Sequence, residues 1–551
     1  MTPRARRGST GLVIAHGTGV ERGVEAARAV LGPDAEITLL SYGRAAQAVP
    51  HVAGAEPLAP PRLRPSEVVR WLRRVRRQRF AVGVVSQPFL TTSRARGALR
   101  LAPFALGAQS AVAVEHDGQA RPIRLPSAVV DAAAFALLLG ASHAASRMAE
   151  LVLRRLAGYW SAHRATLGPI PVAGRVLYLR TDVDLVRQPL TGGGSLSHTN
   201  GIIEALRRRG SDVELWTTGD IAGEASTLPR RTLPVLPLGN IPVEVAELGS
   251  GILQYWRLRR TVAPAFIYQR YSMNNLLGVL LSRRWHVPLV LEANASEVQW
   301  RSEWSSLVFP ALGVSCERAI LQASDRIAAV SANAAGLLRD MGAVDGALRV
   351  VPNGVDVERF ACARPAELPW PDAFVVGFAG LFYPWHGVGC LVQAFVALAR
   401  RLPDARLLLV GDGEEAPRVR SILRDAEVDK LCLHTGLVPF DDVPGHLAAC
   451  SVLVSPHVRN DRFIGSPIKL WEYMAAGRPI VATRVAQLEE VLENERTALL
   501  VDPNDSSVLV DALVRLHDDP ALGSRLGVAA QNEARQLHSW DTRLEMTLAA
   551  L

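Results

Sequence analysis

Short apolar runs alternate with longer amphipathic segments along most of the chain. Short apolar runs bounded by turn residues are typical of buried parallel strands. Segments with apolar residues every three or four positions are typical of helices. The alternation predicts strand–helix units in three series. The expected strands are 11–15, 37–40, 81–85 and 111–114; 175–179, 213–216, 265–268, 288–291 and 326–330; and 374–379, 406–410, 431–434, 451–455 and 479–482.

This order predicts an α/β protein with two doubly wound, Rossmann-like domains in tandem, preceded by an additional small α/β domain. We expect a Pro-rich loop at 53–65 within that first domain. The expected units are an Arg-rich accessory domain at 1–126, a helical connector at 127–170, Rossmann-like domains at 171–362 and 363–535, and a C-terminal helix at 536–551.

Composition excludes several classes of protein. Hydrophobic residues make up 49% and charged residues 21% of the 551 residues, which argues against general disorder. Five scattered cysteines argue against a disulfide scaffold or a zinc ribbon and fit a reducing compartment. The longest charge-free apolar stretch, 132–145, is shorter than the roughly 20 residues that a membrane-spanning helix needs. We therefore expect a soluble or peripheral protein.

The net charge of +8 is concentrated at the front of the chain, where arginines far outnumber acidic residues. The segment 66–79 has helical spacing, with Val68, Leu72 and Val75 in one stripe and arginines around it. Such a helix can lie on an anionic membrane surface. The alternative is an ordinary solvated helix. No aromatic stacking pattern accompanies the arginines, so no nucleic-acid partner is expected.

Lysine is almost absent, and one of the two lysines lies in a segment with candidate chemistry. The 61 basic residues other than histidine include only Lys430 and Lys469 as lysines. Ser466 and Pro467 open an expected helix in which Lys469 and Glu472 share one face. One interpretation is a surface ion pair of little value. The other is a cation that meets phosphates and a carboxylate that accepts ribose hydroxyls.

Glycines stand at several expected strand ends. Gly193 and Gly194 belong to a Gly-rich stretch, 191–201, that we expect to be a loop before a helix at 202–209. Backbone N–H groups in such a loop can approach a phosphate closely. The alternative is a merely flexible loop. Further glycines follow expected strands at Gly380, Gly411 and Gly413.

From about residue 175 to the end, the chain resembles family 4 glycosyltransferases. These are retaining, nucleotide-sugar-dependent enzymes of the GT-B fold. The motifs that carry the resemblance are Gly193-Gly194, 329–331, 352–356, 378–380, 410–413 and 472–477. The resemblance implies a cytoplasmic, metal-independent and cofactor-free hexosyltransferase, peripheral on the inner membrane face, that uses a UDP- or GDP-sugar and a lipid-linked or cell-surface glycan acceptor.

The resemblance also implies roles for individual residues. Glu472 would contact the ribose, and Gly193 and Gly194 would face the pyrophosphate. Other predicted donor-binding residues are Gly380, Leu381, Gly411, Gly413, Ser466, Pro467 and Lys469.

Three positions depart from the family pattern. Leu381 stands where the family has an arginine, His386 where it has a lysine, and Ile464 where it has a first glutamate. Our hypothesis is that Lys469 and His386 take over the pyrophosphate. The departures leave two alternatives open: a catalytically silent sugar-nucleotide-binding or scaffold protein, and a sugar-nucleotide epimerase or hydrolase.

On the acceptor side, the candidates lie near strand ends. Asn294 takes the place where relatives often carry a histidine near the reacting sugar. Glu292 lies beside it, and the two are either catalytic or a buried capping pair. Arg270 is a candidate for acceptor contact. Asp182, in an Asp-x-Asp sequence, is assigned to the acceptor side or to structure in preference to a metal. His198 is an acceptor-side candidate or a helix-cap residue.

Overall fold

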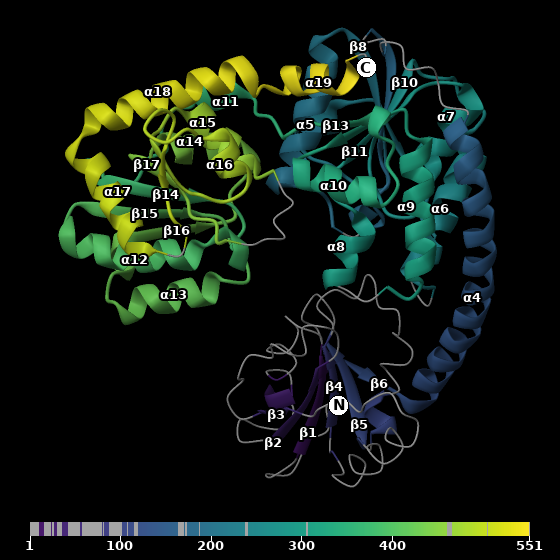
Figure 1. Ribbon diagram of the computed structural model, residues 1–551. Helices are drawn as coiled ribbons and strands as arrows, with labels where there is room; N and C mark the ends of the chain where they lie inside the picture. Colours follow the sequence, from purple (N-terminus) through teal and green to yellow (C-terminus); the bar gives the residue numbers. More distant parts are fainter. Residues whose placement is uncertain are drawn as a thin grey trace.

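Three β-sheets form the framework of the computed structural model of the protein (Figure 1). The structure describes residues 10–15, 24, 27–29, 36–41, 55–57, 80, 82–86, 102–106, 108–114, 120–162, 170, 173–186, 188–236, 241–304, 307–459, 466–503 and 505–549. The predicted amphipathic helix at 66–79 and the departure at Ile464 lie outside these residues.

The first sheet has the strand order β3-β2-β1-β4-β5-β6 and is parallel except for β6, which pairs antiparallel with β5. All four predicted strands are present. The short edge strands β3 and β6 were not predicted, and β3 corrects part of the expected loop at 53–65. Pro57 ends β3, and an edge strand tolerates proline because one side of it needs no ladder hydrogen bonds. The strands are β1 (Thr10–Ala15), β2 (Glu36–Ser41), β3 (Ala55–Pro57), β4 (Val82–Ser86), β5 (Ser110–Val114) and β6 (Ala120–Ile123).

The second sheet is parallel and has the order β13-β12-β11-β10-β7-β8-β9. The order reverses direction between β7 and β10, as in doubly wound sheets. Its strands are β7 (Gly174–Arg180), β8 (Ser211–Thr217), β9 (Arg230–Thr232), β10 (Phe266–Arg270), β11 (Leu289–Ala293), β12 (Arg326–Ala329) and β13 (Leu348–Val350).

Helices cover both faces of the second sheet. α5 (Gly193–Arg208) packs on one face, and α6 (Val243–Leu258), α7 (Leu277–Trp285) and α9 (Pro310–Ala323) pack on the other. α4 (Leu125–Ala162) runs from the first sheet to the second and packs against α9 (Figure 1). α8 (Glu297–Trp304) follows β11, and α10 (Ala332–Asp340) follows β12.

The third sheet is also parallel, with the order β16-β15-β14-β17-β18-β19. Its order reverses between β14 and β17. The strands are β14 (Phe374–Ala379), β15 (Ala405–Val410), β16 (Cys432–Gly436), β17 (Val452–Ser455), β18 (Ile480–Thr483) and β19 (Leu499–Val501). The helices are α11 (Val357–Ala361), α12 (Val388–Arg401), α13 (Ala416–Asp425), α14 (Val443–Ala448), α15 (Ile468–Ala476), α16 (Gln487–Val491), α17 (Ser506–Asp518) and α18 (Pro520–Leu537). The two tandem sheets confirm the predicted fold class.

The Gly-rich stretch is helical, which corrects the predicted loop at 191–201. α5 begins at Gly193, nine residues before the expected start at residue 202. Arg180, at the end of β7, donates hydrogen bonds to Thr199 Oγ1 at 2.5 Å and Ser195 Oγ at 3.3 Å. These two bonds hold the first turns of α5 against the sheet and offset the poor helix propensity of glycine.

The C-terminal helix α19 (Trp540–Leu548) returns from the third sheet to the second, where it packs against α5 (Figure 1). The buried Trp540 belongs to the same core cluster as Leu196 and Ile202 of α5. Gly201 makes this close approach possible, because a Cβ there would lie 2.2 Å from Trp540 Nε1.

Gly201→Ala should therefore destabilise the protein by about 1–3 kcal/mol, because the added methyl group forces Trp540 to move. Denaturant unfolding measures the change. Gly336→Ala in α10 is the matched control, since no heavy atom lies within 4 Å of its added Cβ. That change should stabilise slightly, by about 0.5–1 kcal/mol. Equal effects of the two substitutions would contradict the close α5–α19 contact.

Candidate functional site

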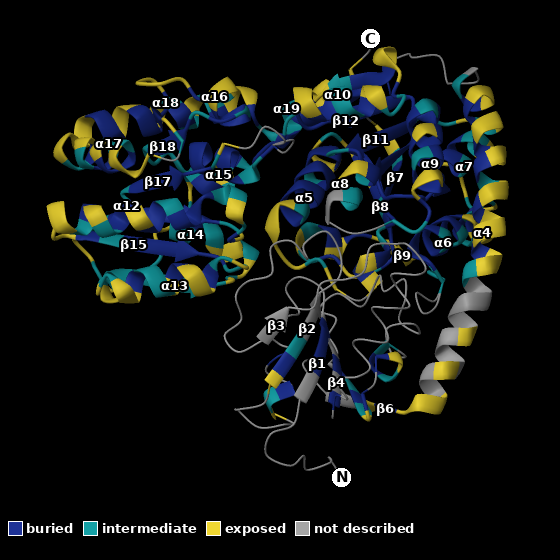
Figure 2. Cartoon of the chain, turned by 60° about the horizontal axis from the view of Figure 1, so that its bottom comes forward, coloured by how far each residue is buried: buried dark blue, intermediate teal, exposed yellow. Residues whose placement is uncertain are grey.

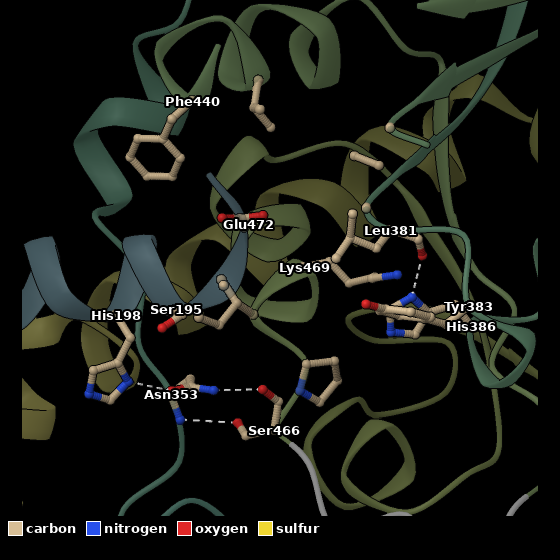
Figure 3. A pocket seen from close by; sticks show the side chains of 18 of the residues that line it. Ser195, His198, Asn353, Leu381, Tyr383, His386, Phe440, Ser466, Lys469 and Glu472 are labelled. Atoms are coloured by element: carbon tan, nitrogen blue, oxygen red, sulfur yellow. Dashed lines mark hydrogen bonds between the residues drawn. The ribbon is translucent and has the colours of Figure 1, made fainter. Parts of the chain in front are cut away.

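A cavity of about 630 Å³ lies between the second and third sheets, at the carboxyl ends of several of their strands (Figure 3). Its walls come from the start of α5, the segments after β14 and β16, and the start of α15. Such edges, where the strand order reverses, are the usual ligand sites of doubly wound folds. The cavity is therefore the natural candidate site.

Most of the predicted site residues line this cavity. They are Gly193, Gly194, His198, Arg270, Asn294, Gly380, Leu381, His386, Gly411, Ser466, Pro467, Lys469 and Glu472. Three do not line it: Asp182, Glu292 and Gly413. Gly413 instead permits a tight turn, since a Cβ there would lie 2.7 Å from the Phe382 backbone nitrogen.

The N-terminus of α5 is one wall of the cavity. Its cap residue is Gly192, and no side chain caps the helix. Gly193, Gly194 and Ser195 of the first turn all line the cavity. The free N–H groups of a first helical turn carry a partial positive charge. This wall is therefore suited to an anion.

Lys469 supplies the second positive group. Its side chain is buried, with 8% exposure, which excludes the surface ion pair. Within the described part of the chain its Nζ has no hydrogen-bond partner, and it lies 4.3 Å from the centre of the Phe378 ring. Gly380 makes room for it, because a Cβ there would lie 2.9 Å from Nζ. Burial lowers the pKa of Lys469 to about 7, although Glu472 opposes this shift.

Glu472 lies one turn further along α15. Burial raises the pKa of its carboxyl to about 7, and the charges of Lys469 and Arg359 oppose the change. Figure 3 shows the carboxylate between Lys469 and Phe440. Leu437, Val438, Phe440 and Val443 form an apolar part of the cavity wall. The site thus offers a cation, a carboxylate and an apolar surface.

His386 is not a cation at neutral pH. Its Nδ1 lies 2.5 Å from the Leu381 carbonyl oxygen, so Nδ1–H is the donor and Nε2 is left as an acceptor. Burial and the nearby Lys469 lower its pKa to about 3. The ring therefore offers a hydrogen-bond acceptor. The Tyr383 and Trp385 rings beside it are stacked, with centres 4.6 Å apart.

On the opposite side, His198 is fixed between two oxygen atoms. Its Nδ1 lies 2.7 Å from Asn353 Oδ1, and its Nε2 lies 2.7 Å from Glu292 Oε2. Asn353 Nδ2 donates to the Ser466 carbonyl oxygen, which requires its Oδ1 to face the histidine. An imidazolium would donate to both oxygen atoms. Asn353 thereby links α5 to the segment that begins α15.

Glu292 supports the cavity wall from behind. It is buried and forms ion pairs with His198 and Arg270, which both line the cavity. Burial by itself raises its pKa, but the positive groups of His198 and Arg270 prevail and lower the pKa to about 2. The carboxylate therefore pairs with two side chains of the cavity wall, and it does not itself line the cavity, where it was expected.

The other acceptor-side candidates differ in position. Asn294 lines the cavity, and its Oδ1 is buried without a hydrogen-bond partner among the described residues. Asp182 lies off the cavity, where its carboxylate pairs with Arg180 Nε at 2.9 Å. Its backbone carbonyl accepts a hydrogen bond from Thr218 at 2.5 Å. Asp182 thus has a structural position.

Several residues of the wall had no predicted role. Asn353 lies in the 352–356 motif, but no function was expected of it. Trp300, on α8, lines the cavity with 41% of its surface exposed. No sequence signal marked it. The other lining residues without a predicted role are Ser195, Val330, Ala379, Tyr383, Trp385, Val410, Leu437, Val438, Phe440, Val443 and Ile468.

Replacing Glu292 tests the buried network. Glu292→Gln should destabilise the protein at neutral pH by about 3–5 kcal/mol, because it leaves the buried Arg270 charge uncompensated. Because the folded-state pKa is lowered, the contribution of Glu292 is complete above pH 4.5 and is lost as the pH falls towards 2. Denaturant unfolding across this range measures both effects.

The wild-type and Glu292→Gln stability curves should therefore converge in acid. Glu493→Gln is the control, because Glu493 pairs with Arg496 on the exposed surface, where ion pairs contribute little. Parallel curves for wild type and Glu292→Gln would contradict the assigned network.

Two family descriptions match the part of the chain that builds the cavity. Residues 193–354 match "Glycosyl transferase 4-like domain", and residues 373–519 match "Glycosyl transferases group 1". D-inositol 3-phosphate glycosyltransferase of Streptomyces avermitilis is 28% identical in an alignment of 408 residues that covers 68% of this chain and 86% of that protein. The protein of the same name from Pseudarthrobacter chlorophenolicus is 28% identical over 68% of this chain and 94% of its own length.

Solved structures share the fold. The structure of HepE from Anabaena in complex with UDP has a TM-score of 0.51 and 19% identity, over 67% of this chain and 97% of that chain. Sucrose-phosphate synthase of Thermosynechococcus elongatus has a TM-score of 0.53 and 21% identity, over 68% of this chain and 97% of that chain.

Proposed function

The chain carries two glycosyltransferase domains in a GT-B fold, and on that premise we propose that it transfers a hexose from a UDP- or GDP-sugar to a glycan acceptor. The transfer retains the anomeric configuration and needs neither a metal nor a cofactor. The observation that carries the proposal is the buried Lys469 ammonium, which has no hydrogen-bond partner in the described residues and lines the same cavity as the start of α5.

The pyrophosphate of the donor would bind between these two positive groups. The N–H groups of Gly193, Gly194 and Ser195 would meet one side of it, and Lys469 the other. As the bond to the sugar breaks, negative charge grows on the leaving phosphate. Donors that are already in place stabilise that charge without reorganising. His386 Nε2 would accept a hydrogen bond from the sugar or from Lys469.

The nucleoside would occupy the other part of the cavity. Glu472 would accept hydrogen bonds from the ribose hydroxyls. The apolar wall that includes Leu437 and Phe440 would cover a face of the base. This order of base, ribose and pyrophosphate follows the order of Phe440, Glu472 and Lys469 in Figure 3.

The acceptor would enter from the side of the second sheet. Arg270, Asn294 and Trp300 line the cavity there. A partly exposed tryptophan and polar side chains suit a sugar, which has an apolar ring face and hydroxyl edges. We propose a lipid-linked or cell-surface glycan as the acceptor. Inositol phosphate, the substrate named for the relatives, is the alternative that the assay must include.

The residues that line the cavity are consistent with a retaining mechanism in which the leaving phosphate departs from, and the acceptor attacks, the same face of the sugar. Among the described residues that line the cavity, Glu472 is the only carboxylate, and we assign it to the ribose. No second carboxylate there is available to form a covalent sugar intermediate. The His198 ring nitrogens already face Glu292 and Asn353.

One experiment tests the reaction itself. The protein is incubated with a panel of UDP- and GDP-sugars and a membrane extract or inositol phosphate, and nucleotide release and product anomers are measured by NMR. We expect release that depends on the acceptor and a product with the donor's configuration. Release without acceptor would indicate an epimerase or hydrolase, and binding without release would indicate a scaffold. An inverted product would contradict retention.

Lys469→Ala should lower the rate of transfer by about 10²–10³-fold, because a preorganised positive group at the leaving phosphate is lost. Steady-state kinetics measure the change, and circular dichroism checks the fold. Lys430→Ala is the matched control. Lys430 is the other lysine, and it lies exposed in the short 3-10 helix Asp429–Leu431 that follows α13. Unchanged turnover in Lys469→Ala would overturn the donor assignment.

Glu472→Ala should remove the preference for ribose over deoxyribose. Calorimetry with UDP or GDP and their deoxy forms measures this preference. We expect the wild type to favour the ribose forms by about 10-fold or more, because a deoxy ligand leaves the carboxylate unpaired. A preference that persists in the variant would place the ribose elsewhere.

A further inference from the structure

The outer face of α4 exposes apolar side chains in a single stripe. Met148 and Leu151 are 64% and 60% exposed, and Val152 and Tyr159 are also exposed. Their spacing along the helix brings all four onto one side. The opposite side packs Leu153, Ala157 and Trp160 into the core of the second sheet. Figure 2 shows exposed residues along this outer length of α4.

The charged residues on the outer face are arginines alone. Arg155 lies within the apolar stripe, and the exposed Arg147 and Arg154 lie along its border. The acidic Glu150 is buried on the inner side, where Arg147 reaches it at 3.4 Å. From residue 139 to residue 161, where burial is described throughout, α4 therefore exposes no carboxylate.

The neighbouring helices on the same face of the sheet also expose apolar side chains and arginines. α6 contacts α4 and exposes Ile252 and Trp256, with Arg257 and Arg260 at its end. The two glutamates of α6 are buried. α7 exposes Arg284 and contains no acidic residue. Apolar and positive side chains thus dominate what these helices present to the outside.

We propose that the outer face of α4, defined by Met148, Leu151, Val152, Arg154, Arg155 and Tyr159, docks the protein on an anionic phospholipid bilayer. A helix that lies in the plane of a membrane places apolar side chains at the headgroup boundary and arginines on the lipid phosphates. Tyrosine is suited to this boundary, since it has an apolar ring and a polar end. A second copy of the chain would oppose arginine to arginine without carboxylates to pair them.

This surface lies on residues that the structure describes, separate from the predicted helix at 66–79. None of the described helices has the length and hydropathy to cross a bilayer, so the contact is one of surface binding. α4 packs on the domain that supplies the acceptor side of the cavity. Docking there would keep that side near a membrane. The inference does not require the proposed reaction, because vesicle binding needs no substrate.

Flotation of the full-length protein with lipid vesicles tests the proposal. We expect binding to vesicles of phosphatidylcholine mixed with phosphatidylglycerol, weak binding to phosphatidylcholine alone, and release at high salt. Arg154→Gln/Arg155→Gln should weaken binding roughly 30-fold. Leu151→Ser/Val152→Ser should weaken it about tenfold or more. Val528→Ser/Leu537→Ser on α18, which removes two similarly exposed apolar side chains, is the matched control and should bind as the wild type does.

Three results would overturn the proposal. The first is that both α4 variants bind vesicles as strongly as the wild type does. The second is a loss of binding that occurs only when Arg73, Arg74, Arg76 and Arg77 of the 66–79 segment become glutamine. The third is an absence of vesicle binding together with a concentration-dependent dimer in light scattering that the α4 variants abolish.

Discussion

A buried ammonium group without a hydrogen-bond partner is the constraint around which the cavity is arranged. Removing a lysine charge from water is costly unless an anion compensates for it. Lys469 rests on the Phe378 ring, and Gly380 leaves the space beside it open. Burial, together with the Lys469 charge, lowers the pKa of His386 and keeps its ring neutral. The uncapped first turn of α5 lines the same cavity, so two positive groups face it, and the donor pyrophosphate would compensate for both.

On the proposed acceptor side, the charged side chains are arranged differently from those around Lys469. Glu292 pairs with both Arg270 and His198, so the charges there are compensated within the protein. Asn353 connects this network to Ser466, at the start of the helix that carries Lys469. The charges on one side are therefore paired within the protein, whereas Lys469 on the other side has no hydrogen-bond partner among the described residues. Such a division suits a site in which an anionic leaving group departs from a fixed position.

Strand positions and the tandem sheets were predictable because buried parallel strands leave a strong apolar signal. The start of α5 was not predictable, since glycines favour loops and only Arg180, distant in sequence, holds them in a helix. Most candidates at strand ends line one cavity, because parallel strands end at one edge of a sheet. The other positions depend on side-chain contacts that the sequence does not reveal. Glu292 forms an ion pair with Arg270 and does not line the cavity. Trp300 and Phe440 line the cavity, although they belong to segments without a motif.

The central claim is that Lys469 binds the pyrophosphate of the donor. Proton uptake on nucleotide binding tests this claim most directly. Titration calorimetry with UDP or GDP, in buffers of different ionisation enthalpy and about one pH unit above the Lys469 pKa of about 7, counts the protons bound. The account predicts uptake of nearly one proton by the wild type and none by Lys469→Arg, because arginine is already charged. Equal uptake by both proteins, or none by the wild type, would contradict it.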